Sequence, residues 1–403
     1  MSEPSRSNDA PRPVARRCAS CGYPVVLGRC FTCEGRRLAR LVHRELVLLA
    51  LLLCLTGVAF VTTRAVAQSN ESLRREQATA WFTQAAGASG RGETAAAVVA
   101  LRRAVSKDPG SRRYRLALSK ALVASGVSSE AERVLLALRQ AEPEDPEVNL
   151  SLARLKARGP ETDAARRYYQ YALAALWQPE DADERQQVRL ELVELLLARG
   201  ERARALSELL RVATSLPPEP DINVRVGRMF FVAGDPRAGL EHFLRALRAH
   251  PTNSAALGGA AEAAFALGDY RRALRYLDAA PDERRRLASL QDTARLVLDL
   301  DPLAPRLGTG ERLRRLRALL EHATERLRAC ASDRPALHLA GEVATLREAL
   351  ERPRRGDVRD LIDEGVAVAF RVESATEQNC ATAQTLRGRA VTLIARQHGL
   401  GDQ

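Results

Sequence analysis

The stretch "AGDPRAGLEHFLRALRAHP" (residues 233–251), together with "LGDYRRALRYLDAAP" (residues 267–281), determines the fold class of this chain. Each stretch opens on a Gly-Asp turn, continues with apolar residues three and four positions apart, and ends at a proline. Glycine allows the left-handed backbone that ends a helix, whereas proline stops the helix that follows. Each stretch therefore predicts a turn and then an amphipathic helix.

The same pattern occurs six times, mostly 34 residues apart, which is the signature of a repeat of helix pairs. A small residue five positions after each glycine would let two helix backbones approach closely. An apolar residue four positions later falls on the same helical face and would fill the core between repeats. The turn glycines are Gly92, Gly126, Gly159, Gly200, Gly234 and Gly268; the small residues are Ala97, Ala131, Ala164, Ala205, Gly239 and Ala273; the apolar residues are Leu101, Leu135, Tyr168, Leu209, Phe243 and Leu277; four of the repeats add Pro109, Pro143, Pro217 and Pro251.

These motifs resemble the tetratricopeptide repeat (TPR) family over residues 78–287. The resemblance implies an all-α, TPR-type solenoid of six helical hairpins, and a family habit of binding peptides or helices of other proteins along a concave face. The third repeat departs from the pattern, because it lacks the proline and carries seven extra residues at 178–184. The Lys/Asn combination with which some chaperone-binding relatives hold a terminal carboxylate is not reproduced.

Side chains of the first helix of each repeat are expected to line that concave face. The candidate partner-binding residues on these helices are Arg113, Lys120, Asn149, Lys156 and Arg228, with Phe231 and Phe265 as apolar contacts.

Residues 288–403 lose the 34-residue period but remain helical in pattern, with helices expected near 311–330, 336–352, 357–374 and 382–397. We expect this segment to be a C-terminal helical cap that covers the last repeat. Two cysteines, Cys330 and Cys380, would form a disulfide if the cap lies in an oxidising compartment. His322 has acids nearby, yet we expect an ordinary surface histidine.

An uncharged apolar run occupies residues 46–63 and spans roughly 27 Å as a helix, which predicts one transmembrane helix. Five arginines stand shortly before the run and three shortly after it, and residues 64–77 read as a linker. Positive residues stay on the cytoplasmic side, so the N-terminus is expected in the cytoplasm and the repeats outside. A competing hypothesis is a signal peptide cleaved near Ala65-Val66-Ala67.

Four cysteines precede this run, within residues 16–36: Cys18, Cys21, Cys30 and Cys33. Two C-x₂-C pairs, with Gly22 and Gly35 turning the backbone, predict a structural zinc ion in a closed four-thiolate site and resemble the short bacterial zinc ribbons. An iron site has the same ligands but usually a longer separation between the pairs, and a redox dithiol would need a βαβ context. Residues 1–15 are expected to be disordered.

Residues 1–45 carry +5 of the net charge of +12 and the other +7 is spread among alternating Glu and Arg. Only 4% of residues are aromatic, so nucleic-acid binding is not expected. The six histidines show no catalytic or ligand spacing, and no nucleotide-binding motif occurs, so an enzyme is not expected either. Usage rich in Gly, Ala and Arg and poor in Lys suggests a GC-rich bacterium.

The leading hypothesis is an inner-membrane, single-pass scaffold whose periplasmic repeats gather other proteins in envelope assembly or secretion. A transmembrane regulator that relays partner binding to a cytoplasmic factor through the zinc ribbon is the alternative. An inverted topology stays open, and the sequence does not indicate an oligomeric state.

Overall fold

A computed structural model describes residues 17–25, 29–213, 219–330, 334–353, 358–379 and 385–401; the predicted disordered N-terminus lies outside these residues. The described residues contain seventeen α-helices, two 3₁₀ helices and no β-strand, which confirms the all-α fold class. The chain divides into two compact units, residues 1–138 and 139–403.

The helices from residue 78 to residue 279 follow one another as six hairpins, in the order that the repeats predict. The first helices are the end of α1 (Phe31–Gly90), α3 (Arg112–Ala124), α5 (Pro146–Ala157), α7 (Ala182–Ala198), α9 (Pro220–Ala233) and α11 (Ser254–Ala266). The second helices are α2 (Thr94–Lys107), α4 (Ser128–Ala141), α6 (Thr162–Ala174), α8 (Arg202–Ala213), α10 (Pro236–Ala249) and α12 (Tyr270–Ala279). The seven extra residues contain the short 3₁₀ helix η1 (Pro179–Asp181) and the first residues of α7.

Five of the six predicted turn glycines adopt the left-handed backbone, with φ between 72° and 99°, and Gly159 does not. The turn after Gly159 is one residue longer than the other five, because Pro160 stands in it and α6 begins three residues after the glycine. As a consequence Ala165, not the predicted Ala164, is fully buried, and Tyr169 replaces Tyr168 as the buried apolar residue. In the other repeats the predicted small and apolar residues are buried.

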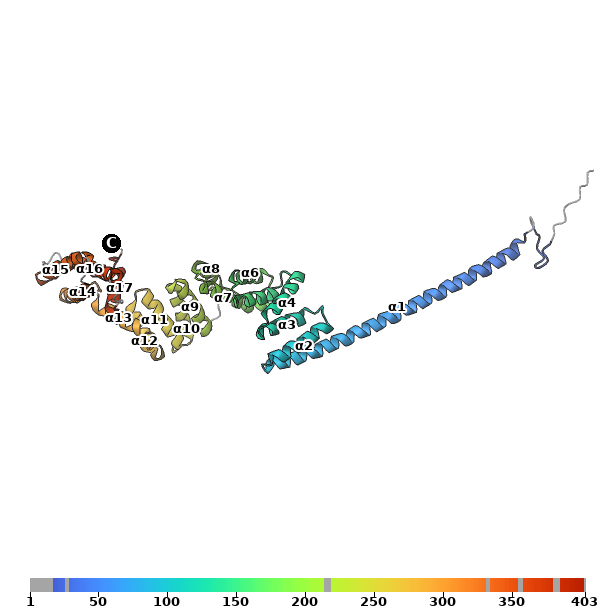
Figure 1. Cartoon of the computed structure of the whole chain (residues 1–403), viewed down its shortest axis with the longest axis horizontal. Helices are drawn as coiled ribbons and strands as arrows, with labels where there is room; N and C mark the ends of the chain where they lie inside the picture. Colours follow the sequence, from blue (N-terminus) through green and yellow to red (C-terminus); the bar gives the residue numbers. More distant parts are fainter. Residues whose placement is uncertain are drawn as a thin grey trace, which may run out of the picture. The chain divides into compact units, whose positions relative to one another are not determined.

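Helix α1 is one unbroken helix of 60 residues, drawn in blue to cyan in Figure 1. The expected linker at residues 64–77 is therefore helical, since no glycine or proline interrupts it. The last turns of α1 bury Ala78, Ala85 and Ala88, and they pack against α2 as the first helix of repeat one. Ala78 lies fifteen helical steps after Thr63, or about 22 Å farther along the helix.

The apolar run at residues 46–63 forms the middle of α1 and is exposed on every side. Leu53 is 71% exposed and Phe60 is 66% exposed, and the apolar window as a whole has no buried residue. The described part of α1 is long and apolar enough to cross a bilayer.

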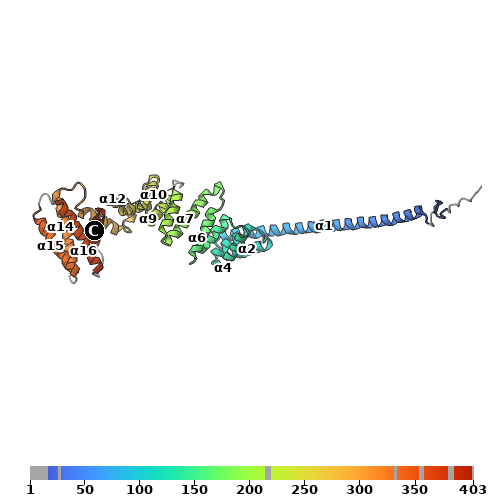
Figure 2. The same ribbon diagram turned by 90° about the horizontal axis from the view of Figure 1, so that it is seen from above.

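The C-terminal helices form a bundle, and their core joins that of the last repeat. These helices are α13 (Ala288–Leu300), which follows the 3₁₀ helix η2 (Pro281–Glu283), then α14 (Thr309–Ala329), α15 (Arg334–Glu351), α16 (Val358–Asn379) and α17 (Leu386–Gln397). Figure 2 shows α14, α15 and α16 beside one another, and α17 packs on both α13 and α16. Tyr270 of α12 lies in the same apolar cluster as this bundle, so the last repeat and the bundle share a core.

Candidate metal centre and repeat surface

The four N-terminal cysteines converge on one point. Cys18 and Cys21 lie in a turn closed by the Gly22 amide, which donates to the Cys18 carbonyl at 2.9 Å, and Gly22 has φ 74°. Cys30 stands directly before α1, and Cys33 lies in the first turn of that helix. All four Sγ atoms lie within 4.8 Å of one another.

The sulfur distances suit a tetrahedral ion. Cys18 Sγ lies 3.8 Å from Cys33 Sγ, and Cys21 Sγ lies 3.3 Å from Cys30 Sγ. Zinc–sulfur bonds of about 2.3 Å would place tetrahedral sulfurs about 3.8 Å apart, so a zinc ion fits with a small expansion of the second pair. The four thiolates would fill every coordination position, which leaves none for a substrate.

Backbone donors and neighbouring sulfurs shift the pKa values of these thiols in opposite directions. The amides of Ser20 and Cys21 lower the pKa of Cys18 to about 6, which favours the thiolate form that a metal needs. The other three sulfurs raise the pKa of Cys33 to about 12. The predicted role of Gly35 as the turn of the second knuckle is wrong, because Gly35 lies within α1 and Cys33 is presented by a helix turn instead.

Two of the predicted groove residues are used inside the repeats. Asn149 is completely buried, accepts a hydrogen bond from Arg139 Nε at 3.0 Å, and donates to the carbonyls of Pro143 and Asp145. Lys156 is 8% exposed, and its Nζ lies 2.8 Å from a carboxylate oxygen of Glu161. The expectation that these two side chains face an open groove is therefore wrong.

A recurring motif explains the burial of Asn149. Asn223 is also buried, and its Nδ2 donates to the Glu219 carbonyl, as Asn149 Nδ2 does to Asp145. Both asparagines stand three residues after a proline that opens a first helix, in "PEVN" and "PDIN". The repeated motif is a signal in the sequence for a structural asparagine that ties down a helix start.

The remaining groove candidates are more accessible. Arg113 is exposed on α3, where its guanidinium stacks 4.4 Å from the centre of the Phe82 ring, and Lys120 is exposed on the same helix. Arg228 is exposed on α9. Phe231 and Phe265 are half-buried and pack against the cores of their repeats, so only part of each ring is open to a partner.

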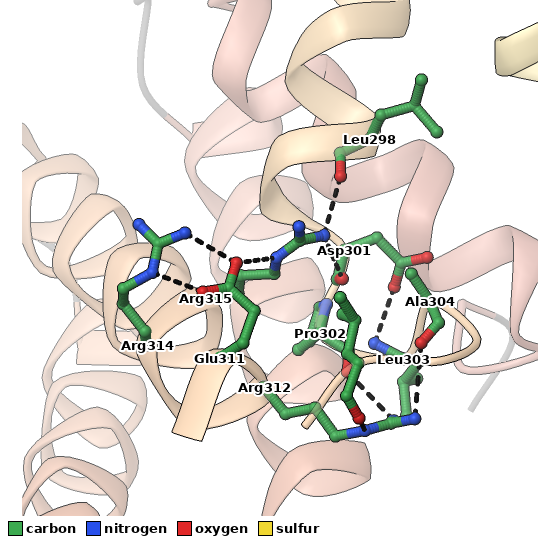
Figure 3. Close-up of polar contacts among 10 residues, drawn as sticks. Leu298, Asp301, Pro302, Leu303, Ala304, Glu311, Arg312, Arg314 and Arg315 are labelled. Carbon is green, nitrogen blue, oxygen red and sulfur yellow. Dashed lines mark hydrogen bonds and ion pairs between the residues drawn. The ribbon is translucent and has the colours of Figure 1, made fainter. Parts of the chain in front are cut away.

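Arginines in the cap hold its own loops (Figure 3). Arg312 donates to the carbonyls of Pro302, Ala304 and Leu307, and Arg315 donates to those of Leu298 and Asp301. Glu311 accepts from Arg314 and Arg315, which lower its pKa to about 2. The guanidinium groups of Arg312 and Arg315 thus bind the backbone carbonyls at the end of α13 and in the connection from α13 to α14.

A second charged cluster lies inside the cap. His322, expected at the surface, is 6% exposed, and its Nε2 lies 2.8 Å from Glu373 Oε1. Arg326 Nε lies 3.3 Å from the other oxygen of Glu373. A Cβ at Gly388 would lie 2.4 Å from Glu373 Oε2, so α17 can cover this carboxylate only with a glycine there.

Of the two cysteines predicted to pair, Cys330 ends α14 and is disulfide-bonded. Cys380 lies outside the described residues, so the pairing of Cys330 with Cys380 stays a prediction.

Comparison with known families finds tetratricopeptide repeats in this chain. Residues 88–155 and 231–293 match the tetratricopeptide repeat family, over helices that the structure arranges as hairpins. Among curated proteins, no sequence matches the chain.

Three solved structures illustrate the structural likeness. A Pseudomonas aeruginosa pilF protein is 17% identical, with 53% of this chain and 94% of that one covered at a TM-score of 0.42. PilW, described as a widely conserved type IV pilus biogenesis factor, is 17% identical, with 52% and 94% covered at 0.41. A tetratricopeptide repeat protein from Parabacteroides merdae is 11% identical, with 72% and 99% covered at 0.40. The assignment of the fold therefore stands on the family match and on the helices themselves.

Proposed function

We propose that this chain is a single-pass, membrane-anchored scaffold that binds other polypeptides through its tetratricopeptide repeats. The observation that carries the proposal is one continuous helix, α1, which joins an exposed apolar segment of bilayer length to the first repeat. An interaction module fixed at a membrane gathers partners there, and the described part of the repeats holds no catalytic arrangement that would favour an enzyme.

Lipid is the environment that suits the middle of α1. Leaving a large apolar side chain in water rather than burying it costs about 1.5–3 kcal/mol, and Leu46, Leu53 and Phe60 belong to a long series of such side chains. Backbone hydrogen bonds within the helix satisfy the polar groups that a bilayer cannot. Insertion into a membrane would remove the whole exposed series from water.

The direction of insertion follows from charge and from cysteine chemistry. Five arginines precede the apolar run and three follow it, which favours a cytoplasmic N-terminus. The cytoplasm would keep the four clustered thiols reduced for zinc. The disulfide-bonded Cys330 would lie on the other side of the membrane, where disulfides persist. We therefore propose a periplasmic repeat domain in a bacterial inner membrane, acting in envelope assembly or secretion.

A regulator is the second candidate, favoured by the unbroken course of α1. Cys33 of the metal centre and Ala78 of the first repeat belong to the same helix. A movement of the repeats on binding a partner would reach the zinc ribbon without passing through a flexible joint.

Membrane fractionation of the full chain tests the anchor. We expect the wild type to stay in the carbonate-washed pellet, and the double substitution Leu53→Arg, Val58→Arg to release it. The matched control is Leu73→Arg, Val66→Arg, which places the same charges on exposed positions outside the run. A wild-type chain that washes off with carbonate would contradict the anchored scaffold.

Crosslinking of the full chain in intact cells tests the binding role. We expect discrete partners that are lost when residues 78–287 are deleted and that remain when Cys18 and Cys21 are replaced by serine. Partners that depend on the cysteines but not on the repeats would contradict the scaffold and favour a ribbon-centred function.

A further inference from the structure

A cavity of about 610 Å³ opens where the seven extra residues meet the fourth repeat. Its walls come from the α6–α7 connection, the first turns of α7 and the end of α8. The lining residues are Trp177, Gln178, Ala182, Asp183, Arg185, Gln186, Arg189, Arg211 and Val212.

The wall beside the insertion is held by side chains. Trp177 Nε1 donates to the Ala172 carbonyl at 2.8 Å, which fixes the indole at the end of α6. Arg185 donates to the Leu173 carbonyl at 3.2 Å and so ties the start of α7 to the same helix end. The cavity is thus formed before any ligand arrives, which keeps the ordering cost of binding low.

Positive charge in this cavity is only partly balanced. Arg189 and Arg211 lie 3.7 Å and 3.8 Å from carboxylate oxygens of Glu208, which is longer than a hydrogen bond. The wall thus holds three arginines and one acid, Asp183, with Glu208 beside Arg189 and Arg211 as the second acid. Burial lowers the pKa of Arg189, and the charges of Arg185 and Arg211 lower it further, against the effect of Glu208. One additional anion would relieve this repulsion.

A neutral donor completes the cavity, and two exposed leucines stand next to its lining residues in the sequence. Gln186 Nε2 is buried and has no hydrogen-bond partner within the described part of the chain. Leu176 is 90% exposed beside Trp177, and Leu210 is 61% exposed beside Arg211. A buried donor without a partner is unfavourable, and an exposed leucine leaves apolar surface in water; an acidic ligand with an apolar neighbour would relieve both.

We propose that this cavity, named here the insertion pocket, binds a carboxylate of an acidic and partly apolar segment of a partner polypeptide. The excess of one positive charge suits a single carboxylate, whereas a phosphate dianion would stand against Asp183 and Glu208. Arginine pairs with carboxylates through two parallel hydrogen bonds, and the indole of Trp177 would cover the adjacent apolar side chain. This inference rests on the proposed scaffold role and adds the chemistry of its partner.

The test is a selection of random dodecapeptides on the full chain in lipid nanodiscs, followed by affinity measurements on the selected peptides. Each peptide is made with a free and an amidated C-terminus, and with its acids replaced by amides, to separate a terminal carboxylate from a side chain. The chain variants are Arg189→Gln with Arg211→Gln, and Glu208→Gln. The matched control is Arg237→Gln, an exposed arginine on α10 to which no binding role is assigned.

We expect acid-rich peptides that bind at least tenfold more weakly to the double arginine variant and several-fold more tightly to Glu208→Gln, with no change in the control. The opposite effects of the two changes separate loss of a binding group from loss of folding. Selected peptides without acids, or acidic peptides that bind the double arginine variant as tightly as the wild type, would overturn the insertion pocket and leave the scaffold intact. Failure to select any peptide would overturn both. Competition by inorganic phosphate, but not by acetate, would also overturn the choice of a carboxylate.

Discussion

Replacing Gly259 by alanine should destabilise the junction of the fifth and sixth repeats. Phe243, which is 1% exposed, occupies the position where four other repeats carry leucine, and it inserts its ring between glycines. A Cβ at position 259 would lie 2.4 Å from two ring carbons of Phe243, closer than any allowed contact. Gly227 would meet the same ring at 3.0 Å.

The expected magnitude is the balance of two effects. Alanine favours a helix over glycine by about 1 kcal/mol, whereas overpacking of a core costs about 1–3 kcal/mol. The neighbouring substitution Gly258→Ala has the same helical benefit, but its Cβ meets the side chain of Glu283, which can move away. We expect Gly259→Ala to be about 1–3 kcal/mol less stable than Gly258→Ala.

The assay is urea unfolding of the full chain in detergent, followed by circular dichroism, with hydrogen exchange of α9, α10 and α11 as the local measurement. Phe243→Leu should remove most of the penalty, so the double variant with Gly259→Ala should be more stable than the two single changes predict. Equal stability of the two alanine variants, or no rescue by Phe243→Leu, would refute the packing argument.

Three further predictions concern buried and metal-binding groups. The purified chain should contain one zinc ion per chain by elemental analysis, and Cys33→Ser should lose it while Cys54→Ser keeps it. Burial and the charge of Arg245 lower the pKa of His242 to about 4. The stability of the fold should therefore fall between pH 6.5 and pH 4, by at most about 3 kcal/mol, because the unfolded state takes up the proton first. The variant His242→Gln should flatten this dependence of stability on pH. Glu373→Gln should lower the free energy of unfolding by about 3–5 kcal/mol, because His322 and Arg326 lose their shared anion. The control Glu364→Gln, on the exposed face of α16, should change it by less than about 0.5 kcal/mol. Equal melting curves for these two variants would show that the buried cluster is not an ion pair.

The period of the sequence predicted the hairpins because glycine and proline report backbone geometry directly. The left-handed turns at Gly92 and Gly268, and the helix ends before Pro109 and Pro251, follow from that local chemistry. In the third repeat the predicted buried positions are one residue too early. Gly159 matches the turn pattern, but Pro160 adds one residue to the turn, so every buried position of α6 comes one residue later.

Side-chain roles were harder to predict than helices. Asparagine and lysine are common at protein surfaces, so the sequence gives no sign that Asn149 and Lys156 are buried. Their structural role becomes clear only from their partners in the fold, such as Arg139 for Asn149. The burial of His322 depends on Glu373, which lies fifty-one residues later on another helix. The insertion pocket was missed for the same reason, although the seven extra residues had marked its position as unusual.

Because α1 is unbroken, inserted residues change the rotation of the repeats about the helix axis relative to the metal centre by a known angle. One residue inserted within 64–77 would turn everything beyond it by about 100° and advance it by about 1.5 Å, whereas seven residues would leave it within about 20° of its starting azimuth and about 10 Å farther from the bilayer. A tether would tolerate either change. If α1 transmits a rotation to the zinc ribbon, signalling should survive seven added residues and fail with one or two. A periodic dependence of signalling on the number of inserted residues would therefore show that α1 transmits rotation.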